Sequence, residues 1–321
     1  MCFLALNSSL IYLLGVIIAF GLTILFLHSF SDKLPHDQGR AFAVDGALSK
    51  GKARGAGLLL IVVLVLCDVL FNQLSVERTI YLMVITFSMI SGYLDDASEK
   101  PWNEYLKGAI DFVLSLAIAV TYLYYNGNTF TIGILGSMEV TIPYWFYGLL
   151  IVALVWMAIN VTNCSDGVDG LCGTLSIITM GSFYVIMKSI SGIGDFAFTL
   201  VLSIVVILGY LWYNSTPSTI LMGDAGSRAL GVIIAIAALK SGSPLLYIPL
   251  SIVMILDGGL GLLKVALLRF LKIRILKNTR CPLHDQARKV GNWSNTQVCY
   301  RFAIIQVMVS LVFIWAYWIL G

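Results

Sequence analysis

The chain has 321 residues, of which 59% are hydrophobic and only 12% are charged, and its mean hydropathy is +0.91. This composition is far from that of soluble globular domains and indicates an integral membrane protein. The net charge of +3 comes without a soluble basic domain or an interleaved aromatic platform, which argues against nucleic-acid binding. The six Cys residues show no CxxC or Cys/His spacing, so we expect neither a disulfide framework nor a zinc site.

Apolar runs of about 18 residues recur along the whole chain and predict an all-α polytopic membrane protein with ten transmembrane helices. The runs cover residues 9–30, 56–74, 79–97, 105–125, 144–163, 171–189, 195–213, 226–242, 245–268 and 299–320. We expect one integral-membrane domain over residues 1–321. The first run lacks a basic flank and a cleavage site, so it is expected to remain as a helix. Alternating Thr residues within 126–143 predict a small surface hairpin.

The Lys and Arg residues are distributed very unevenly between the predicted connections. Threading ten spans places 17 of them on one side and three, Arg78, Lys188 and Lys240, on the other. Cytoplasmic connections carry the excess of basic residues in membrane proteins. The side with 17 basic residues is therefore predicted to be cytoplasmic, with both termini outside.

Polar motifs fall at the predicted cytoplasmic ends of several different helices. Two adjacent carboxylates close the third span, an Asn-rich and Asp-rich turn joins the fifth and sixth, and a Gly-Asp-x-Gly-Ser turn precedes the eighth. The residues concerned are Asp95, Asp96, Asn163, Asp166, Asp169, Asp224, and, in neighbouring loops, Lys50, Lys107 and His284. Random placement would have scattered the carboxylates over both sides, so their coincidence on one face favours a functional site.

Each motif taken alone also has a structural explanation. Carboxylates often end a span, and Asp at a helix N-terminus caps it and suits its dipole. Capping explains one Asp in 163–170; it does not explain an Asn and two Asp interleaved with Gly. A lone His beside an Asp is usually a surface pair, and the basic stretch 272–289 is what a cytoplasmic flank normally carries. Asp257 lies inside the ninth span, where a charge is functional or paired by default, and the following Gly258-Gly259 could break the helix.

Carboxylates close to cations at a membrane surface suit a Mg²⁺ ion that shares its ligands with a diphosphate. Phosphoryl transfer needs positioning and neutralisation of charge more than any special side chain. Since the predicted site lies at the bilayer surface, we expect a lipid phosphate as donor or acceptor.

The motifs at 92–96, 163–170 and 222–227 and the loop with His284, in this order on ten spans, resemble the polyprenyl-phosphate N-acetylhexosamine-1-phosphate transferase superfamily. Residues 293–298, followed by Arg301-Phe302, are similar to the end of its phospho-N-acetylmuramoyl-pentapeptide transferase branch. The resemblance covers essentially the whole chain. It implies that UDP-N-acetylmuramoyl-pentapeptide donates its phospho-sugar to undecaprenyl phosphate, giving lipid I and UMP. It also implies a bacterial plasma membrane location with the active site facing the cytoplasm, and it allows a homodimer.

The resemblance implies residue roles by position. Asp224 matches the Mg²⁺ ligand, and Asp95 and Asp96 match a pair that deprotonates or holds the lipid phosphate. The remaining matches are Lys107 near that phosphate, Asn163, Asp166 and Asp169 on the nucleotide and diphosphate side, Lys50 as the basic substrate contact after the first span, and His284 among the catalytic residues. With Mg²⁺ present, the resemblance favours direct attack by the lipid phosphate over a covalent phospho-enzyme.

Three departures from the family pattern are visible. A run of His is here His284 followed by Asp285 and Gln286, and Leu221 stands where an aromatic side chain is expected to stack on uracil. A Lys-x-Gly-Thr-Pro-Thr-Met-Gly-Gly stretch is replaced by residues 49–57, in which Lys50 and Lys52 both compete for the position of the lysine.

Three other functions compete with this interpretation. A sister enzyme would transfer N-acetylglucosamine-1-phosphate to the same lipid for teichoic acid or another surface polymer. A secondary transporter would have broken helices, midplane charges and an inverted repeat, and we find no such repeat. A catalytically silent scaffold is disfavoured because Asp95, Asp96 and Asp224 are all present.

Overall fold

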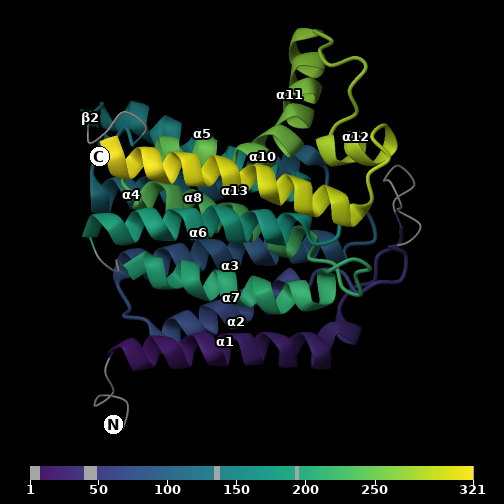
Figure 1. Ribbon diagram of the computed structural model, residues 1–321, viewed down its shortest axis with the longest axis horizontal. Coiled ribbons are helices and arrows are strands. Elements are labelled where there is room, and N and C mark those ends of the chain that lie inside the picture. The colour runs from purple at the N-terminus through teal and green to yellow at the C-terminus, as the bar shows by residue number, and fades with distance from the viewer. Residues whose placement is uncertain (1–7, 40–48, 134–137, 192–194, 321) are drawn as a thin grey trace.

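The computed structural model describes residues 8–39, 49–133, 138–191 and 195–320, and most of them form long helices that run side by side (Figure 1). The helices are α1 (Ser8–Phe30), α2 (Gly57–Phe71), α3 (Val76–Ala97), α4 (Glu104–Asn126), α5 (Tyr144–Cys164), α6 (Leu171–Ser191), α7 (Asp195–Asn214), α8 (Gly223–Lys240), α9 (Tyr247–Leu250), α10 (Ile252–Met254), α11 (Leu260–Ala266), α12 (Leu283–Lys289) and α13 (Asn295–Leu320). Short 3-10 turns η2 (Ser31–Lys33) and η3 (Pro244–Leu246) and π-helical segments η4 (Ile255–Gly259) and η5 (Leu267–Leu271) complete them.

Helices occur at all ten positions where the apolar runs predicted them. Six helices of the described chain are long and apolar enough to cross a membrane, and the bent pair that forms the ninth run makes seven. The remaining three are α2, which has only 15 residues, and α3 and α8, which carry the charges of the site. The predicted all-α polytopic architecture is confirmed at this level.

The centre of the bundle is α8. All its residues from Gly223 to Leu239 are buried, and α3, α5, α2 and α6 pack around it. Helices α2 and α8 can approach this closely only because residue 57 is a glycine: a Cβ on Gly57 of α2 would lie 1.9 Å from the backbone nitrogen of Gly226. A surrounded helix of this kind shields its polar first turn from lipid and leaves it open only at one end of the bundle.

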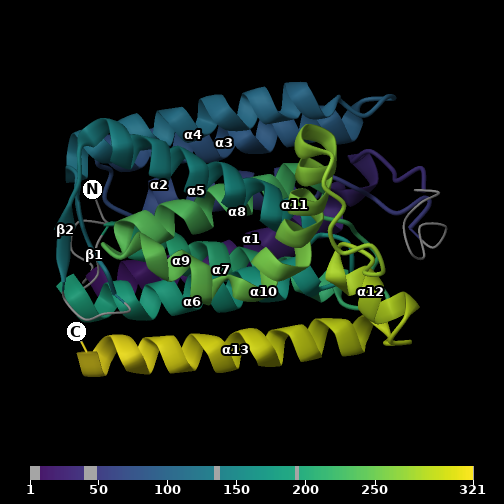
Figure 2. The same cartoon turned by 90° about the horizontal axis from the view of Figure 1, so that it is seen from above.

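The ninth run is broken. The part before Ser251 and the part after it differ in direction by 68°, so the continuous helix expected over 245–268 is wrong. The Gly pair does not mark the break: Gly258 instead lies against α5, where a Cβ would come 2.8 Å from the backbone oxygen of Val161. Beyond it, α11 projects away from the bundle (Figures 1 and 2).

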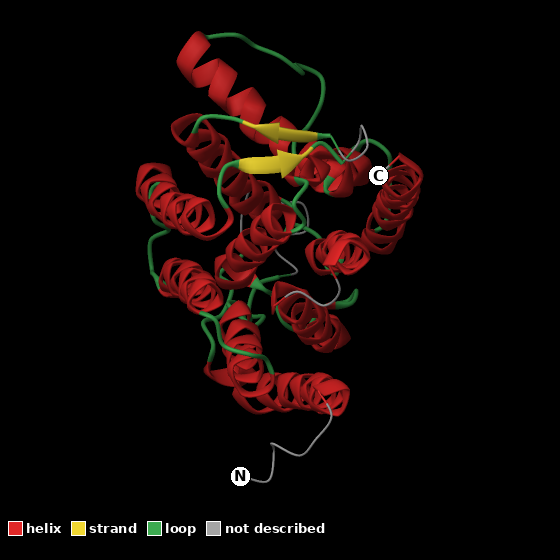
Figure 3. Cartoon of the chain, turned by 90° about the vertical axis from the view of Figure 1, so that its left-hand side faces the viewer, coloured by secondary structure: helices red, strands yellow, loops and turns green. Residues whose placement is uncertain are grey.

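The predicted surface hairpin is present. Strands β1 (Thr129–Thr131) and β2 (Glu139–Thr141) pair antiparallel, with Thr129 opposite Thr141. The hairpin lies at the end of the bundle where α1 begins and α13 ends (Figures 2 and 3). Residues 134–137 of its connection lie outside the described residues, as do Cys2 and Arg40. The five cysteines in the described ranges are free thiols.

Candidate active site

The polar motifs meet at the end of the bundle opposite the β1–β2 hairpin (Figure 2). The end of α3 is brought against the start of α8 by Gly92, where a Cβ would lie 2.4 Å from the backbone oxygen of Asp224. Because Asp95 and Asp96 follow Gly92 within about one helical turn, this close approach carries both carboxylates to Asp224. Gly92 is therefore a packing residue that places the acidic pair.

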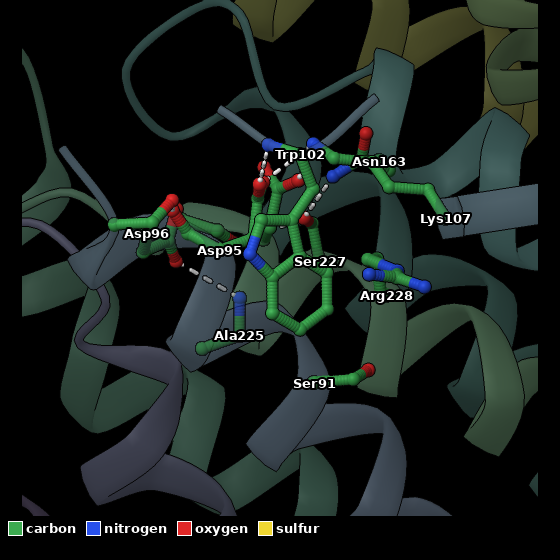
Figure 4. Close-up of polar contacts among 12 residues, drawn as sticks. Ser91, Asp95, Asp96, Trp102, Lys107, Asn163, Ala225, Ser227 and Arg228 are labelled. Atoms are coloured by element: carbon green, nitrogen blue, oxygen red, sulfur yellow. Dashed lines mark hydrogen bonds and ion pairs between the residues drawn. The ribbon is translucent and has the colours of Figure 1, made fainter. Parts of the chain in front are cut away.

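One ammonium group bridges two of these carboxylates (Figure 4). Lys107 Nζ, on the first turns of α4, lies 2.5 Å from Asp95 Oδ2 and 3.0 Å from Asp224 Oδ2. The other oxygen of Asp95 accepts a hydrogen bond of 2.7 Å from the backbone N–H of Trp102. Asp95 is thus held by both oxygens, and three helices converge on Lys107.

Arg54 is the second cation of the cluster, and the sequence analysis missed it. Its Nε lies 2.9 Å from Asp96 Oδ1, its Nη2 3.4 Å from Asp224 Oδ1, and its Nη1 3.7 Å from Asp37 Oδ1. Burial would lower the pKa of Arg54, but the carboxylates of Asp96, Asp224, Asp37 and Asp166 outweigh burial and raise it above its usual value. Arg54 therefore stays a guanidinium ion at any working pH and neutralises part of the acidic cluster.

Asp224 is the most accessible of the three clustered carboxylates. Its side chain is 11% exposed, against 4% for Asp95 and 0% for Asp96, whose Oδ2 accepts a hydrogen bond from the Ala225 backbone. In the described part of the chain no three His, Cys, Asp or Glu side chains are arranged to hold a metal by themselves. Mg²⁺ usually takes one or two protein carboxylates and completes its octahedron with phosphate and water oxygens. Asp224 fits that limited role.

Hydrogen bonds join the 163–170 turn to α8 and to the segment before it, beside the charge cluster. Asn163 Nδ2 donates to Ser227 Oγ at 2.9 Å, which ties the end of α5 to the first turn of α8. Asp169 accepts two hydrogen bonds from Ser218, one from its backbone N–H at 3.0 Å and one from its hydroxyl at 2.8 Å. Lys52 Nζ donates to the same hydroxyl at 2.9 Å. The amide of Asn163 and one carboxylate of its motif are therefore partly used in shaping the turns.

The segment before α2 is fastened to the segment before α8 by backbone pairing. Leu221 N–H donates to the oxygen of Ala53 at 2.8 Å, and the Ala56 N–H donates to the oxygen of Leu221 at 3.1 Å. This pairing places Arg54 and Lys52 at the cluster, whereas Lys50 lies exposed at a turn. The motif left a choice between Lys50 and Lys52. Lys52 is the one that contacts the site, through its hydrogen bond to Ser218.

His284 is buried and paired with Asp257. Its Nδ1 lies 2.8 Å from Asp257 Oδ2, and its backbone N–H donates to Oδ1 at 2.7 Å. The opposite nitrogen faces the 163–170 turn, since a Cβ on Gly167 would lie 2.3 Å from His284 Nε2. The carboxylate orients the ring, and Gly167 leaves room for it. The charge expected to be paired or functional inside the ninth run, Asp257, is therefore paired.

The loop bearing His284 is held onto the 163–170 turn. Arg288 Nη2 donates to the oxygen of Gly167 at 3.3 Å and to Asp285 Oδ1 at 2.6 Å. At the start of α13, the guanidinium of Arg301 lies 4.3 Å from the centre of the Trp293 ring. Asp285, which stands where the run of His is expected to continue, thus orients the arginine that ties α12 to this turn.

Comparison with known proteins gives a consistent assignment. The glycosyl transferase family 4 pattern matches residues 78–242, which include Asp95, Asp96, Lys107 and Asp224. The chain is 40% identical over 296 residues to the phospho-N-acetylmuramoyl-pentapeptide-transferase of Treponema pallidum (strain Nichols), covering 87% of this chain and 81% of that protein. It is 30% identical over 263 residues to the protein of that name from Borrelia turicatae (strain 91E135), with 73% of each covered.

A third relative, the phospho-N-acetylmuramoyl-pentapeptide-transferase of Bartonella quintana (strain Toulouse), is 26% identical over 308 residues, with 87% of this chain and 85% of that protein covered. The region matched by the family includes most of α3 and all of α4 and α8, which carry Asp95, Lys107 and Asp224. The chain belongs to the phospho-N-acetylmuramoyl-pentapeptide transferases of glycosyl transferase family 4.

Proposed function

We propose that the protein transfers phospho-N-acetylmuramoyl-pentapeptide from its UDP-linked donor to undecaprenyl phosphate, giving lipid I and UMP. The observation that supports this most is the convergence of Asp95, Asp96 and Asp224 on Lys107 and Arg54 at one end of the bundle. Phosphoryl transfer is catalysed mainly by positioning and by fixed charges around the transferred group. A cluster in which two cations contact these three carboxylates and Asp37 supplies both.

In the proposed reaction an oxygen of the lipid phosphate attacks the β-phosphorus of the donor. One P–O bond forms there, and the bond from the β-phosphorus to the bridging oxygen breaks, so that UMP leaves with that oxygen. Lys107 and Arg54 neutralise the phosphate charges. Asp95 and Asp96 hold both cations in place, and one of the two carboxylates accepts the single proton of a protonated lipid phosphate.

We assign the metal role to Asp224. Mg²⁺ bound there, with the diphosphate oxygens as its other ligands, would supply further neutralisation of the charge that develops during transfer. Asn163, Asp166 and Asp169 are proposed to face the nucleotide and its diphosphate, with Leu221 beside the uracil and the exposed Lys50 attracting the anionic donor. His284, whose Nε2 faces the 163–170 turn, is proposed to act on the diphosphate side.

We further propose that all ten helical runs cross the bacterial plasma membrane and that the charge cluster faces the cytoplasm. The uneven distribution of Lys and Arg supports this orientation. A UDP-linked donor is water-soluble and undecaprenyl phosphate is held in the bilayer. A site at the end of a membrane bundle is accessible to both.

A direct assay distinguishes the proposed reaction from the sister reaction, in which UDP-N-acetylglucosamine is the donor. We expect the purified protein to release UMP from UDP-N-acetylmuramoyl-pentapeptide only when undecaprenyl phosphate and Mg²⁺ are present. Its kcat/KM for that donor should exceed that for UDP-N-acetylglucosamine by at least roughly a hundredfold, since a donor without the peptide leaves the contacts to that peptide unmade. Preference for UDP-N-acetylglucosamine would favour the sister enzyme. Absence of turnover with both donors would sink the enzymatic proposal.

A further inference from the structure

A second ion pair lies directly behind the charge cluster, with its polarity reversed. Lys107 on α4 and Asp224 on α8 are each followed four residues later by a residue of opposite charge, Asp111 and Arg228. Arg228 Nη2 lies 2.5 Å from Asp111 Oδ1, and both side chains are almost fully buried, at 3% and 2% exposure. Four residues are about one helical turn, so each helix presents one charge to the cluster and the opposite charge one turn deeper.

These pairs belong to a ladder that sets the register of α4 against α8. Close packing joins α4 to α3 and α5, whereas long polar side chains join it to α8. The bridges from Lys107 to Asp224, from Asp111 to Arg228, and from the Tyr122 hydroxyl to the backbone oxygen at position 239 each link residues 117 positions apart. A constant offset means that the two helices run parallel in one register over most of their length.

Stability alone does not explain a buried pair of this kind. Removing two charges from water costs about as much as their attraction returns, so apolar residues of similar size serve stability equally well. The pair is also incompletely satisfied: Asn160 donates to Asp111 Oδ2 at 3.2 Å, but Arg228 Nη1 is buried without a hydrogen-bond partner in the described structure. An arrangement of this cost calls for another role.

Each charge of the pair, left alone, would disturb the cluster. Residues four apart on a helix are neighbours on its surface. An unpaired Asp111 would compete with Asp224 for Lys107, and an unpaired Arg228 would compete with Lys107 for Asp224. Paired with each other, the two deeper charges cancel and leave the upper pair facing the site.

We propose that Asp111 and Arg228 are positioning residues for the transfer reaction, because their mutual neutralisation keeps Lys107 and Asp224 directed at the substrate phosphates. The inference rests on the proposed function. The two residues act through Lys107 and Asp224 and touch no substrate themselves.

The test is a double-mutant cycle with Arg228→Met, Asp111→Asn and the two combined. Arg78→Met is the matched control, since Arg78 is equally buried and pairs with Asp68 at 3.2 Å, but lies 17 residues from Asp95 on α3, about 25 Å along the helix. Arg228→Lys keeps the positive charge and serves as the conservative variant. For each purified protein, thermal stability in detergent, kcat and KM for the donor, and Mn²⁺ affinity by electron paramagnetic resonance are measured.

We expect each single variant of the pair to lose roughly 10- to 100-fold in kcat, the range for residues that orient catalytic groups, with KM changed by less than about threefold. The combined variant and Arg228→Lys should recover most of this loss. Mn²⁺ affinity should be weaker in Asp111→Asn, where a free guanidinium faces Asp224, and unchanged or stronger in Arg228→Met. Arg78→Met should lower thermal stability while leaving kcat and Mn²⁺ affinity within about twofold.

A purely structural pair would give different results. Single variants that fold and keep full kcat would overturn the proposal, as would a combined variant no better than the worse single one. So would Mn²⁺ affinities that fall together in both single variants. If the unaltered protein shows no turnover, the proposed function fails while the Mn²⁺ measurements still decide the pair; if it turns over but binds no Mn²⁺, only the metal assignment fails, and the kcat cycle decides.

Discussion

An Asp224→Asn variant is expected to keep its fold and to lose roughly 10²- to 10³-fold in kcat, the cost of removing one fixed charge from a transfer site. Asn has the same shape as Asp, but it lacks the charge that holds Lys107 Nζ at 3.0 Å and Arg54 Nη2 at 3.4 Å. It would also be a much poorer Mg²⁺ ligand. Mg²⁺-dependent release of UMP measures the loss, and thermal melting in detergent checks the fold.

Asp32→Asn is the control for this substitution, because Asp32 is exposed in η2 and takes part in no contact of the charge cluster. It should retain kcat within about twofold, as most surface substitutions do. Full activity of the Asp224→Asn protein would show that the metal and the central charge are placed wrongly.

An Arg54→Met variant is expected to lose roughly 10²-fold or more in kcat and to be less stable by about 1–3 kcal/mol. The stability figure is set below that of a fully buried pair because the Arg54 side chain is 19% exposed. Without the guanidinium, the buried Asp96 loses a contact of 2.9 Å and both Asp37 and Asp224 lose a cation. Turnover assays and denaturation in detergent follow the two effects separately.

Arg54→Lys distinguishes charge from geometry. Lysine keeps the charge, but it cannot span three carboxylates with a planar fork, so an intermediate loss of kcat is expected. Lys100→Met, on the exposed loop between α3 and α4, is the matched loss of a surface cation and should leave kcat unchanged. Equal activities of the Arg54→Met and Lys100→Met proteins would remove Arg54 from the account.

The helices were largely predictable because lipid and buried packing impose the same demand, a long apolar run, on almost every element. The hairpin was predictable because Thr129 and Thr141 alternate with apolar residues beside a turn. The break at Ser251 had a signal in the sequence, Pro249, which cannot continue a helix without a kink, and the search for apolar runs passed over it. The 68° change of direction itself was not predictable, because it depends on packing against α5 and α13. Hydropathy reports where a helix is apolar and gives no information on the direction in which that helix runs.

The acidic half of the site was predictable, and its basic half only in part. Asp95, Asp96, Asp224 and Lys107 stand next to helix ends, where a charge is conspicuous. Arg54 lies in a Gly-rich segment with two lysines, and only its pairing with the segment before α8 shows which cation enters the cluster.

The deeper partners were hidden for a different reason. Asp257 and His284 are 27 residues apart, and no local pattern joins them. Asp111 and Arg228 did leave a signal, since each follows a charge of opposite sign by four residues on its own helix. That spacing would have suggested two facing ion pairs had α4 and α8 been known to lie in parallel.

The central claim, transfer of a phospho-sugar and not of a sugar alone, is tested most directly by following the β-phosphorus of the donor. The protein is incubated with UDP-N-acetylmuramoyl-pentapeptide labelled with ³²P at the β-phosphate, together with undecaprenyl phosphate and Mg²⁺, and the lipid and water-soluble products are separated. The account predicts that the label moves into the lipid fraction while unlabelled UMP is released in equal amount. Label that stays in a water-soluble nucleotide while the lipid acquires the sugar would contradict it.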